Sequence, residues 1–147
     1  MEIVYQHDLV MICYKREEKM LQVSWQSYLT TEDFVRGLRA LLKLTAELDI
    51  EKWLVDARYS DELVIENMRW SKEYIGTALE QSRLKKVARI SSGDEQHEQE
   101  IMKLVDYLFE NYNVPCEIRF YDSKQEALEW LLEKTLDRSE LTPEFLA

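Results

Sequence analysis

Residues 51–58 read EKWLVDAR, and this stretch decides the fold. Its centre is the apolar run Trp53-Leu54-Val55, which follows charged residues and ends at Asp56. A short, continuous apolar run of this kind is typical of a strand that is buried on both faces in the middle of a parallel sheet. A long helical pattern lies on each side of it in the sequence, so we expect a strand–helix–strand alternation.

The rest of the chain supplies the other elements of an α/β fold. Residues 3–14 and 20–25 are rich in β-forming types and predict an antiparallel hairpin across a charged turn. Apolar periodicity predicts helices at residues 29–48, 63–82, 95–112 and 123–132, alternating with strands at 85–90 and 117–121. The sequence therefore predicts one domain over residues 1–147, with a mixed, mostly parallel sheet of about five strands and four main helices. Residues 136–147 are expected to be a short extra helix or a frayed tail.

Composition narrows the function classes. The chain has 147 residues, of which 46% are hydrophobic, and 19 basic against 29 acidic residues give a net charge of −10. This balance argues against nucleic acid or an anionic membrane as a partner, because both attract clustered Lys and Arg. The chain start lacks the pattern of a signal peptide, and no apolar run approaches the roughly 20 residues of a membrane span. Cys13 and Cys116 lie in apolar, strand-like runs without CxxC spacing, which favours buried thiols over a disulfide. We therefore expect a cytoplasmic protein.

Three local patterns predict how helices begin and pack. Thr30 or Thr31 can cap the helix at 29–48, because a Thr side chain accepts hydrogen bonds from the first free N–H groups. Gly37, in the middle of that helix, weakens it but allows close packing there. Ser123 followed by Glu126 is a capping box that opens the last helix.

Polar residues follow the central strand and the next one. Ligands in α/β proteins usually bind at the carboxyl ends of the parallel strands, and here those ends supply Asp56, Arg58, Ser91, Ser92 and Asp94. The stretch from Ser91 to Asp94 could offer backbone N–H groups to an anion, but Asp94 competes for them, so helix capping is the favoured interpretation. Asp56 and Arg58 share a strand face and can pair with each other. An enzyme centred on Asp56, Arg58 and Asp94 is the weakest hypothesis, because it needs convergence in one pocket.

No metal or cofactor site is expected. His97 and Glu100 lie one helical turn apart, and His7 is the only other imidazole. A metal site needs three or four converging ligands, so a solvated helix face is the favoured interpretation of this pair.

The helix predicted at 63–82 carries more apolar residues than one sheet face requires. Its expected core stripe consists of Val64, Met68, Ile75 and Leu79, and a second stripe of Leu63, Trp70 and Tyr74 lies about 90–120° around the cylinder. The second stripe packs on a neighbouring helix or forms an exposed patch. Trp and Tyr are enriched in interface hot spots, so an exposed patch would indicate a protein-binding surface.

The order of elements, together with the stretches KWLVDAR, LKKVARISS and EIRFYDSKQEALEWL, resembles the STAS-like family of SpoIIAA-like, anti-sigma-factor-antagonist domains. The likeness is closest to a divergent bacterial branch and extends from about residue 5 to residue 132. The resemblance implies STAS-like topology and a regulatory, non-catalytic role. In the family a phosphorylatable Ser follows the central strand, and the matching loop here reads DARYSDEL. Ser60 is the hydroxyl at that place, but it lacks the following Gly and is flanked by two carboxylates that would repel a phosphate, so an N-cap role is favoured.

We therefore expect a non-catalytic, cytoplasmic interaction or regulatory module, with a protein partner or a homodimer as the assembly. Its candidate contact surface comprises Tyr59, Ser60, Leu63, Trp70 and Tyr74. The alternative is a small-molecule or lipid-binding domain with an apolar cleft between the second helix and the sheet. The direction of Trp70 and Tyr74 distinguishes the two, since outward side chains favour a partner and inward side chains around a void favour a ligand.

Overall fold

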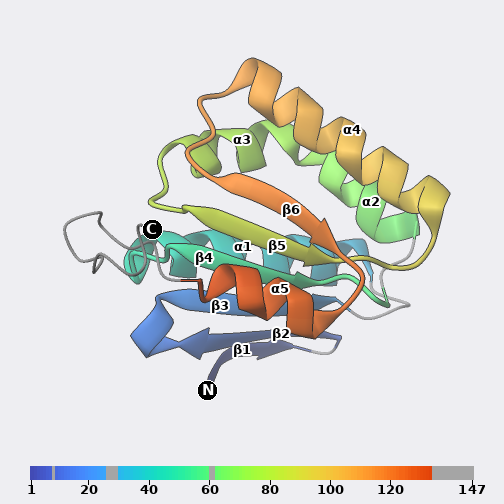
Figure 1. The fold of residues 1–147 in the computed structure, drawn as a ribbon. Helices are drawn as coiled ribbons and strands as arrows, with labels where there is room; N and C mark the ends of the chain where they lie inside the picture. The colour runs from blue at the N-terminus through green and yellow to red at the C-terminus, as the bar shows by residue number, and fades with distance from the viewer. Residues whose placement is uncertain (8, 26–29, 60–61, 134–147) are drawn as a thin grey trace, which may run out of the picture.

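The computed structural model describes residues 1–7, 9–25, 30–59 and 62–133, with residues 62–65 described by their backbone alone. A six-stranded sheet in the order β1-β2-β3-β4-β5-β6 forms its centre (Figure 1). The strands are β1 (Glu2–His7), β2 (Val10–Lys15), β3 (Met20–Trp25), β4 (Lys52–Asp56), β5 (Lys86–Ile90) and β6 (Glu117–Tyr121). The helices are α1 (Thr31–Glu47), α2 (Glu62–Trp70), α3 (Lys72–Glu80), α4 (Glu95–Asn111) and α5 (Lys124–Leu131), and a 3-10 turn, η1 (Arg16–Glu18), joins β2 to β3.

The sheet is mixed, as predicted. Strands β1, β2 and β3 pair antiparallel, and β3, β4, β5 and β6 pair parallel. The strand count is six rather than about five, because residues 3–14 form two strands instead of one. Each of them is six residues long, which is the common strand length, and they pair with each other across the polar break that follows Gln6.

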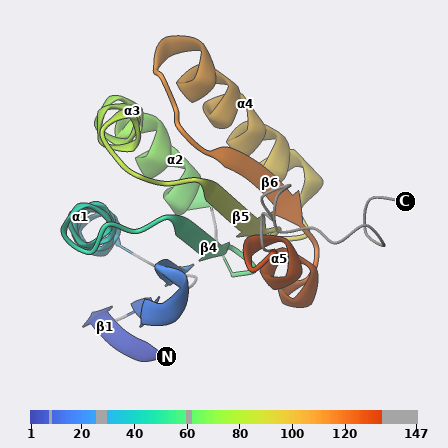
Figure 2. The same ribbon diagram turned by 60° about the vertical axis from the view of Figure 1, so that its left-hand side comes forward.

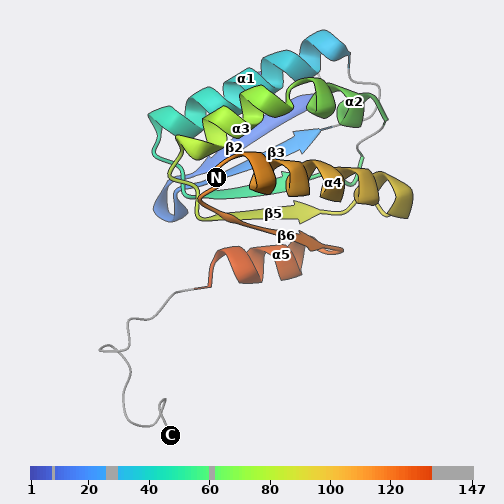
Figure 3. The same ribbon diagram turned by 90° about the horizontal axis from the view of Figure 1, so that it is seen from above.

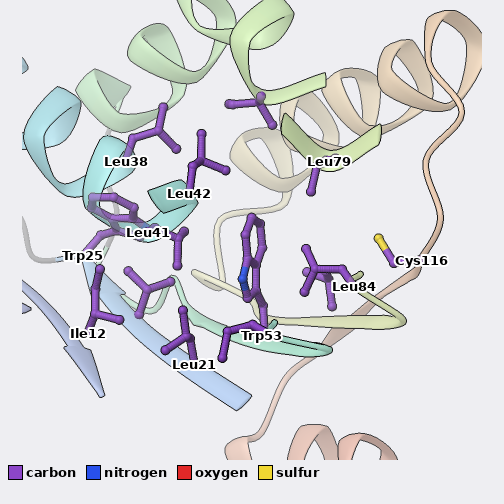
Figure 4. Close-up of a cluster of buried hydrophobic side chains, with 14 of the residues drawn as sticks. Ile12, Leu21, Trp25, Leu38, Leu41, Leu42, Trp53, Leu79, Leu84 and Cys116 are labelled. Carbon is purple, nitrogen blue, oxygen red and sulfur yellow. The ribbon is translucent and has the colours of Figure 1, made fainter. Parts of the chain in front are cut away.

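Strand β4 is an interior strand, as its apolar run predicts. Trp53 is 7% exposed and Leu54 is fully buried, and as consecutive strand residues they point to opposite faces. Trp53 stands up from the sheet into the larger core, between side chains of α1 and Leu84 (Figure 4). Its indole Nε1 donates a 2.9 Å hydrogen bond to Thr45 Oγ1, so the one polar atom of this ring is satisfied inside the core.

The two faces of the sheet are covered unequally. Helices α1, α2, α3 and α4 cover one face, and α5 alone lies on the other (Figure 3). The core under α5 consists of Met20, Leu54, Ala88, Ile90, Ala127, Trp130 and Leu131. On the face that carries four helices, α1 lies over β1 and β2, and α4 lies on the side of β6 (Figure 2).

The predicted helix starts are confirmed. Thr30 Oγ1 accepts a 3.0 Å hydrogen bond from the backbone N–H of Asp33, and Ser123 Oγ accepts one of 3.2 Å from that of Glu126. The predicted close packing at Gly37 is also found, because an added Cβ there would lie 2.8 Å from a Val10 side-chain methyl carbon.

The helix predicted over residues 63–82 is two helices, α2 and α3, separated by Ser71. The hydrogen-bond ladder still runs through the break, since the N–H of Ser71 donates to Asn67 O at 3.0 Å and that of Ile75 donates to Ser71 O at 2.9 Å. The break therefore changes the local geometry without ending the helical course of the chain.

Both cysteines are free thiols, with Cys13 half-buried and Cys116 buried. Burial in apolar surroundings raises the pKa of Cys116 to about 11. Within the described ranges, none of the helices combines the length and the apolar character that crossing a bilayer requires.

Candidate interaction surface

The carboxyl end of β4 holds a charge pair. The Asp56 side chain is 7% exposed, and its two oxygens accept hydrogen bonds from Arg58 Nε at 2.9 Å and Arg58 Nη2 at 2.7 Å. The backbone N–H of Arg58 donates to the same carboxylate at 3.2 Å. Burial opposes ionisation of Asp56, but these hydrogen bonds from Arg58 outweigh it and lower the pKa of the carboxyl group. The predicted pairing is confirmed, and it occupies both groups with each other.

The loop after β5 is a helix-capping loop. Asp94 Oδ1 accepts a 3.2 Å hydrogen bond from the N–H of His97 at the start of α4. Ser91 Oγ accepts from the N–H of Gly93, and Ser92 Oγ accepts from that of Asp94, each at 3.3 Å. Gly93 has a φ of +83°, which a residue with a side chain rarely adopts. The capping interpretation is confirmed, since Asp94 takes the N–H group that an anion would need.

A buried ion pair lies beneath this loop, and the sequence analysis did not identify it. Arg89 of β5 donates from Nε and Nη2 to the two oxygens of Glu98 in α4, at 3.0 and 2.9 Å. The side chains are 6% and 10% exposed. The sequence signal for this pair is the single arginine within the apolar strand KVARI, because a buried arginine needs an anion as its partner. The pair joins α4 to the sheet.

The start of α4 also corrects the interpretation of His97. A solvated helix face was expected there, but His97 is only 7% exposed, because the first turn of α4 faces the sheet end. Glu100 points elsewhere and forms ion pairs with Arg69 of α2 and with Lys103. Among the described residues, no group of three or more His, Cys, Asp or Glu side chains is placed to hold a metal ion.

The candidate contact surface lies where α2 meets α3. Trp70 is 88% exposed and Tyr74 is 52% exposed, so both point outward. They line a groove between α1 and the α2–α3 junction, together with Val35, Leu38, Arg39 and Ser71. We call these six residues the Trp70 groove. Its lining includes two aliphatic side chains, two aromatic rings and a guanidinium group.

The other residues of the predicted surface are only partly placed. Tyr59 is 54% exposed after β4, and the Arg58 guanidinium lies 5.9 Å from its ring centroid. Ser60 lies outside the described residues, and Leu63 belongs to α2 by its backbone. The structure therefore brings Trp70 and Tyr74 together and adds Arg39, which the sequence analysis missed because it lies on α1, about thirty residues earlier in the chain.

A small hollow lies beneath α3. The hollow between α1, α3 and the sheet has a volume of about 100 Å³. It is lined by Leu42, Thr45, Ala46, Trp53, Ala78, Leu79, Gln81, Ser82 and Leu84. Pockets for small molecules are usually about 300–1,000 Å³, so this hollow is smaller than such a pocket.

Comparison with known proteins identifies a family for this chain. A family model described as SpoIIAA-like matches residues 20–132, which is most of the chain. No curated protein and no solved structure matches the chain.

Proposed function

Because the chain belongs to the SpoIIAA-like family, whose STAS-like domains are regulatory and generally non-enzymatic, we propose that it is a cytoplasmic protein-interaction module that binds its partner at the Trp70 groove. The observation that carries the proposal is the outward orientation of Trp70, 88% exposed, beside Tyr74. Burying a Trp or Tyr side chain removes 150–250 Å² of surface from water, so an exposed pair has a large free-energy gain available on binding.

The composition of the groove supports a protein as the partner. Trp, Tyr and Arg are the three residue types most enriched in binding hot spots, and Trp70, Tyr74 and Arg39 supply one of each in the lining of the groove. Among the described residues no carboxylate pairs with Arg39, so its charge is available to a carboxylate on the partner. The net charge of −10 supports the exclusion of nucleic acid.

The polar residues at the strand ends support a non-catalytic role. Asp56 is held by Arg58 and Asp94 by the start of α4, so each carboxylate serves a local structural contact. The hydrogen bonds that lower the pKa of Asp56 keep it ionised, whereas a general base needs a pKa near the working pH.

The proposal is tested by affinity capture with tagged wild-type protein and a Trp70→Ala variant, followed by quantitative mass spectrometry of the bound proteins. Ile3→Ala is the matched control, because Ile3 is an exposed apolar residue of β1 (56% exposed) that does not line the Trp70 groove. We expect a partner that is retained by the wild type and the control and lost with Trp70→Ala. Direct titration of that partner should then show affinity at least about 30-fold weaker for the variant, as for a hot-spot residue.

The thermal stability of Trp70→Ala should stay close to that of the wild type, since the side chain buries almost nothing in the isolated protein. If the two proteins retain the same set of partners, or if the variant unfolds, the Trp70 groove is not the binding site.

A further inference from the structure

Among the described residues, β6 is an edge strand of the sheet, and its one strand neighbour is β5. The N–H of Glu117 donates to Lys85 O at 3.0 Å, and Tyr121 O accepts from the N–H of Ser91 at 2.8 Å, so both residues direct their backbone groups toward β5. Because these directions alternate along a strand, the N–H and C=O groups of Ile118 and Phe120 point away from the sheet. They form a row of donors and acceptors on the outer edge.

Helix α4 carries an apolar stripe on the flank that faces away from α2 and α3. Glu100 and Tyr107 bind side chains of α2 and α3, which fixes the flank of α4 that faces those helices. Met102 and Phe109 each lie two residues further along, about 200° around the helix, and therefore face away from α2 and α3. They are 44% and 46% exposed. Helix α4 itself lies on the side of β6 (Figure 2). An edge strand beside a helix with exposed apolar side chains is a template for strand pairing with another chain.

The charges on β6 are self-complementary. Glu117 and Arg119 point to the same face of the sheet with Ile118 between them, and within one chain they form an exposed ion pair, with Arg119 Nη2 3.0 Å from Glu117 Oε2. If two copies of β6 pair antiparallel with Ile118 opposite Ile118, Glu117 of each copy lies opposite Arg119 of the other. Directly opposed unlike charges stabilise a strand pair, whereas a register centred on Arg119 would oppose two like charges.

We propose that a second copy of this chain docks on the β6 edge, with the two β6 strands antiparallel about a twofold axis at Ile118. The two sheets then continue into one another, and the stripes of Met102 and Phe109 lie on the same side of the joined sheet. In this register Ile118 exchanges both of its outward backbone hydrogen bonds with its own counterpart. An isologous contact of this kind closes at two copies. Both β6 edges are then occupied, so this contact does not build assemblies larger than a dimer.

The charges provide the first test. Sedimentation velocity over a concentration series measures the dimer dissociation constant of the wild type, Glu117→Arg, Arg119→Glu and the double charge swap. Each single reversal turns both cross-strand pairs repulsive and should weaken dimerisation by about tenfold or more. The double swap restores unlike pairs and should return the constant to within about threefold of the wild type. Phe109→Glu should weaken dimerisation to a similar degree, because it places a carboxylate in the apolar stripe.

Cross-linking gives a second test, of the register itself. Glu117→Cys and Arg119→Cys, each made in a Cys13→Ser background, place thiols at directly opposed positions whose Cα atoms are about 4.5 Å apart, which suits a disulfide. A mixture of the Glu117→Cys protein and the Arg119→Cys protein should form a covalent dimer under mild oxidation. Neither protein should form one on its own. Thermal unfolding of every variant checks its fold, since Arg119 also lies 4.6 Å from the ring centroid of Trp130.

Three outcomes would overturn the proposal. They are a strict monomer at about 100 μM, a dimer that is insensitive to Glu117→Arg and Phe109→Glu, and a cross-link formed by Arg119→Cys alone. Trp70→Ala should leave the dimer intact. The proposed β6 contact and the proposed binding at the Trp70 groove are therefore tested separately.

Discussion

The buried pair of Arg89 and Glu98 allows a sharp test of what joins α4 to the sheet. Glu98→Gln keeps the shape of the side chain but removes its negative charge, and the Arg89 guanidinium, with its side chain only 6% exposed, loses its counter-ion. Breaking one partner of a buried pair typically costs about 3–5 kcal/mol, because the remaining charge is left desolvated and uncompensated. The amide can still accept one hydrogen bond, so we expect the lower end, about 3 kcal/mol.

The measurement is urea unfolding followed by circular dichroism. With a slope of about 2 kcal/mol per M, a loss of 3 kcal/mol lowers the midpoint by about 1.5 M. Replacing both partners, as Arg89→Met with Glu98→Leu, removes both charges and should return the stability to within about 2 kcal/mol of the wild type. The control is Glu32→Gln, which breaks an exposed pair with Arg36 and should change the free energy of unfolding by less than about 0.5 kcal/mol.

Two results would refute this reasoning. One is a cost below about 1 kcal/mol for Glu98→Gln, which would mean that water reaches Arg89. The other is a cost of the Arg89→Met, Glu98→Leu double variant that equals the sum of the costs of Arg89→Met alone and Glu98→Leu alone, since that would show no coupling between the partners.

Three further predictions follow from the packing. Gly37→Ala should destabilise the protein by about 1 kcal/mol in thermal unfolding, because overpacking against Trp25, with a contact of 2.9 Å, exceeds the gain in helix propensity; a stabilised variant would contradict the close packing. The Cys116 thiol should react with a disulfide reagent only after denaturation, since it is buried and its pKa is raised to about 11; rapid labelling of the native protein would show that the site opens. Arg58→Ala should cost about 1–2 kcal/mol near neutral pH, because Asp56 loses its partner. The pKa of Asp56 is lowered in the folded state, so this stabilisation is present above about pH 4 and is lost as the pH falls through the folded-state pKa; urea midpoints of the two proteins should therefore converge in acid.

The sequence predicted those features that depend on local pattern. The apolar run around Trp53 identified the interior strand, and the side-chain oxygens of Thr30 and Ser123 identified two helix starts, because each signal lies within a few residues of the structure it specifies. The break at Ser71 was missed, since the periodicity of apolar residues passes through it without interruption. Residues 3–14 predict one strand because most of them favour β structure, and only the polar break after Gln6 marks the boundary between β1 and β2.

The candidate sites depend on contacts between distant segments, which local pattern does not specify. Trp70 and Tyr74 were singled out by their helical spacing, but Arg39 joins them only because α1 packs beside α2. His97 was expected to be solvated, and its burial follows from the docking of α4 on the sheet end. In the same way Arg89 was visible as an arginine in an apolar strand, whereas the identity of its partner required the fold.

The order of the strands in the sheet has a consequence for synthesis on the ribosome. Each strand lies beside the one that precedes it in the chain, so every newly emerged strand finds its neighbour already in place. No strand has to be inserted between two that have already paired, which avoids the slow rearrangement of early, incorrect pairings. The sheet can therefore grow from β1 outward at the pace of translation, and α5 closes the second face only after β6 has been added. Until then the side chains of Leu54, Ala88 and Ile90, which pack under α5 in the finished fold, are left uncovered on that face.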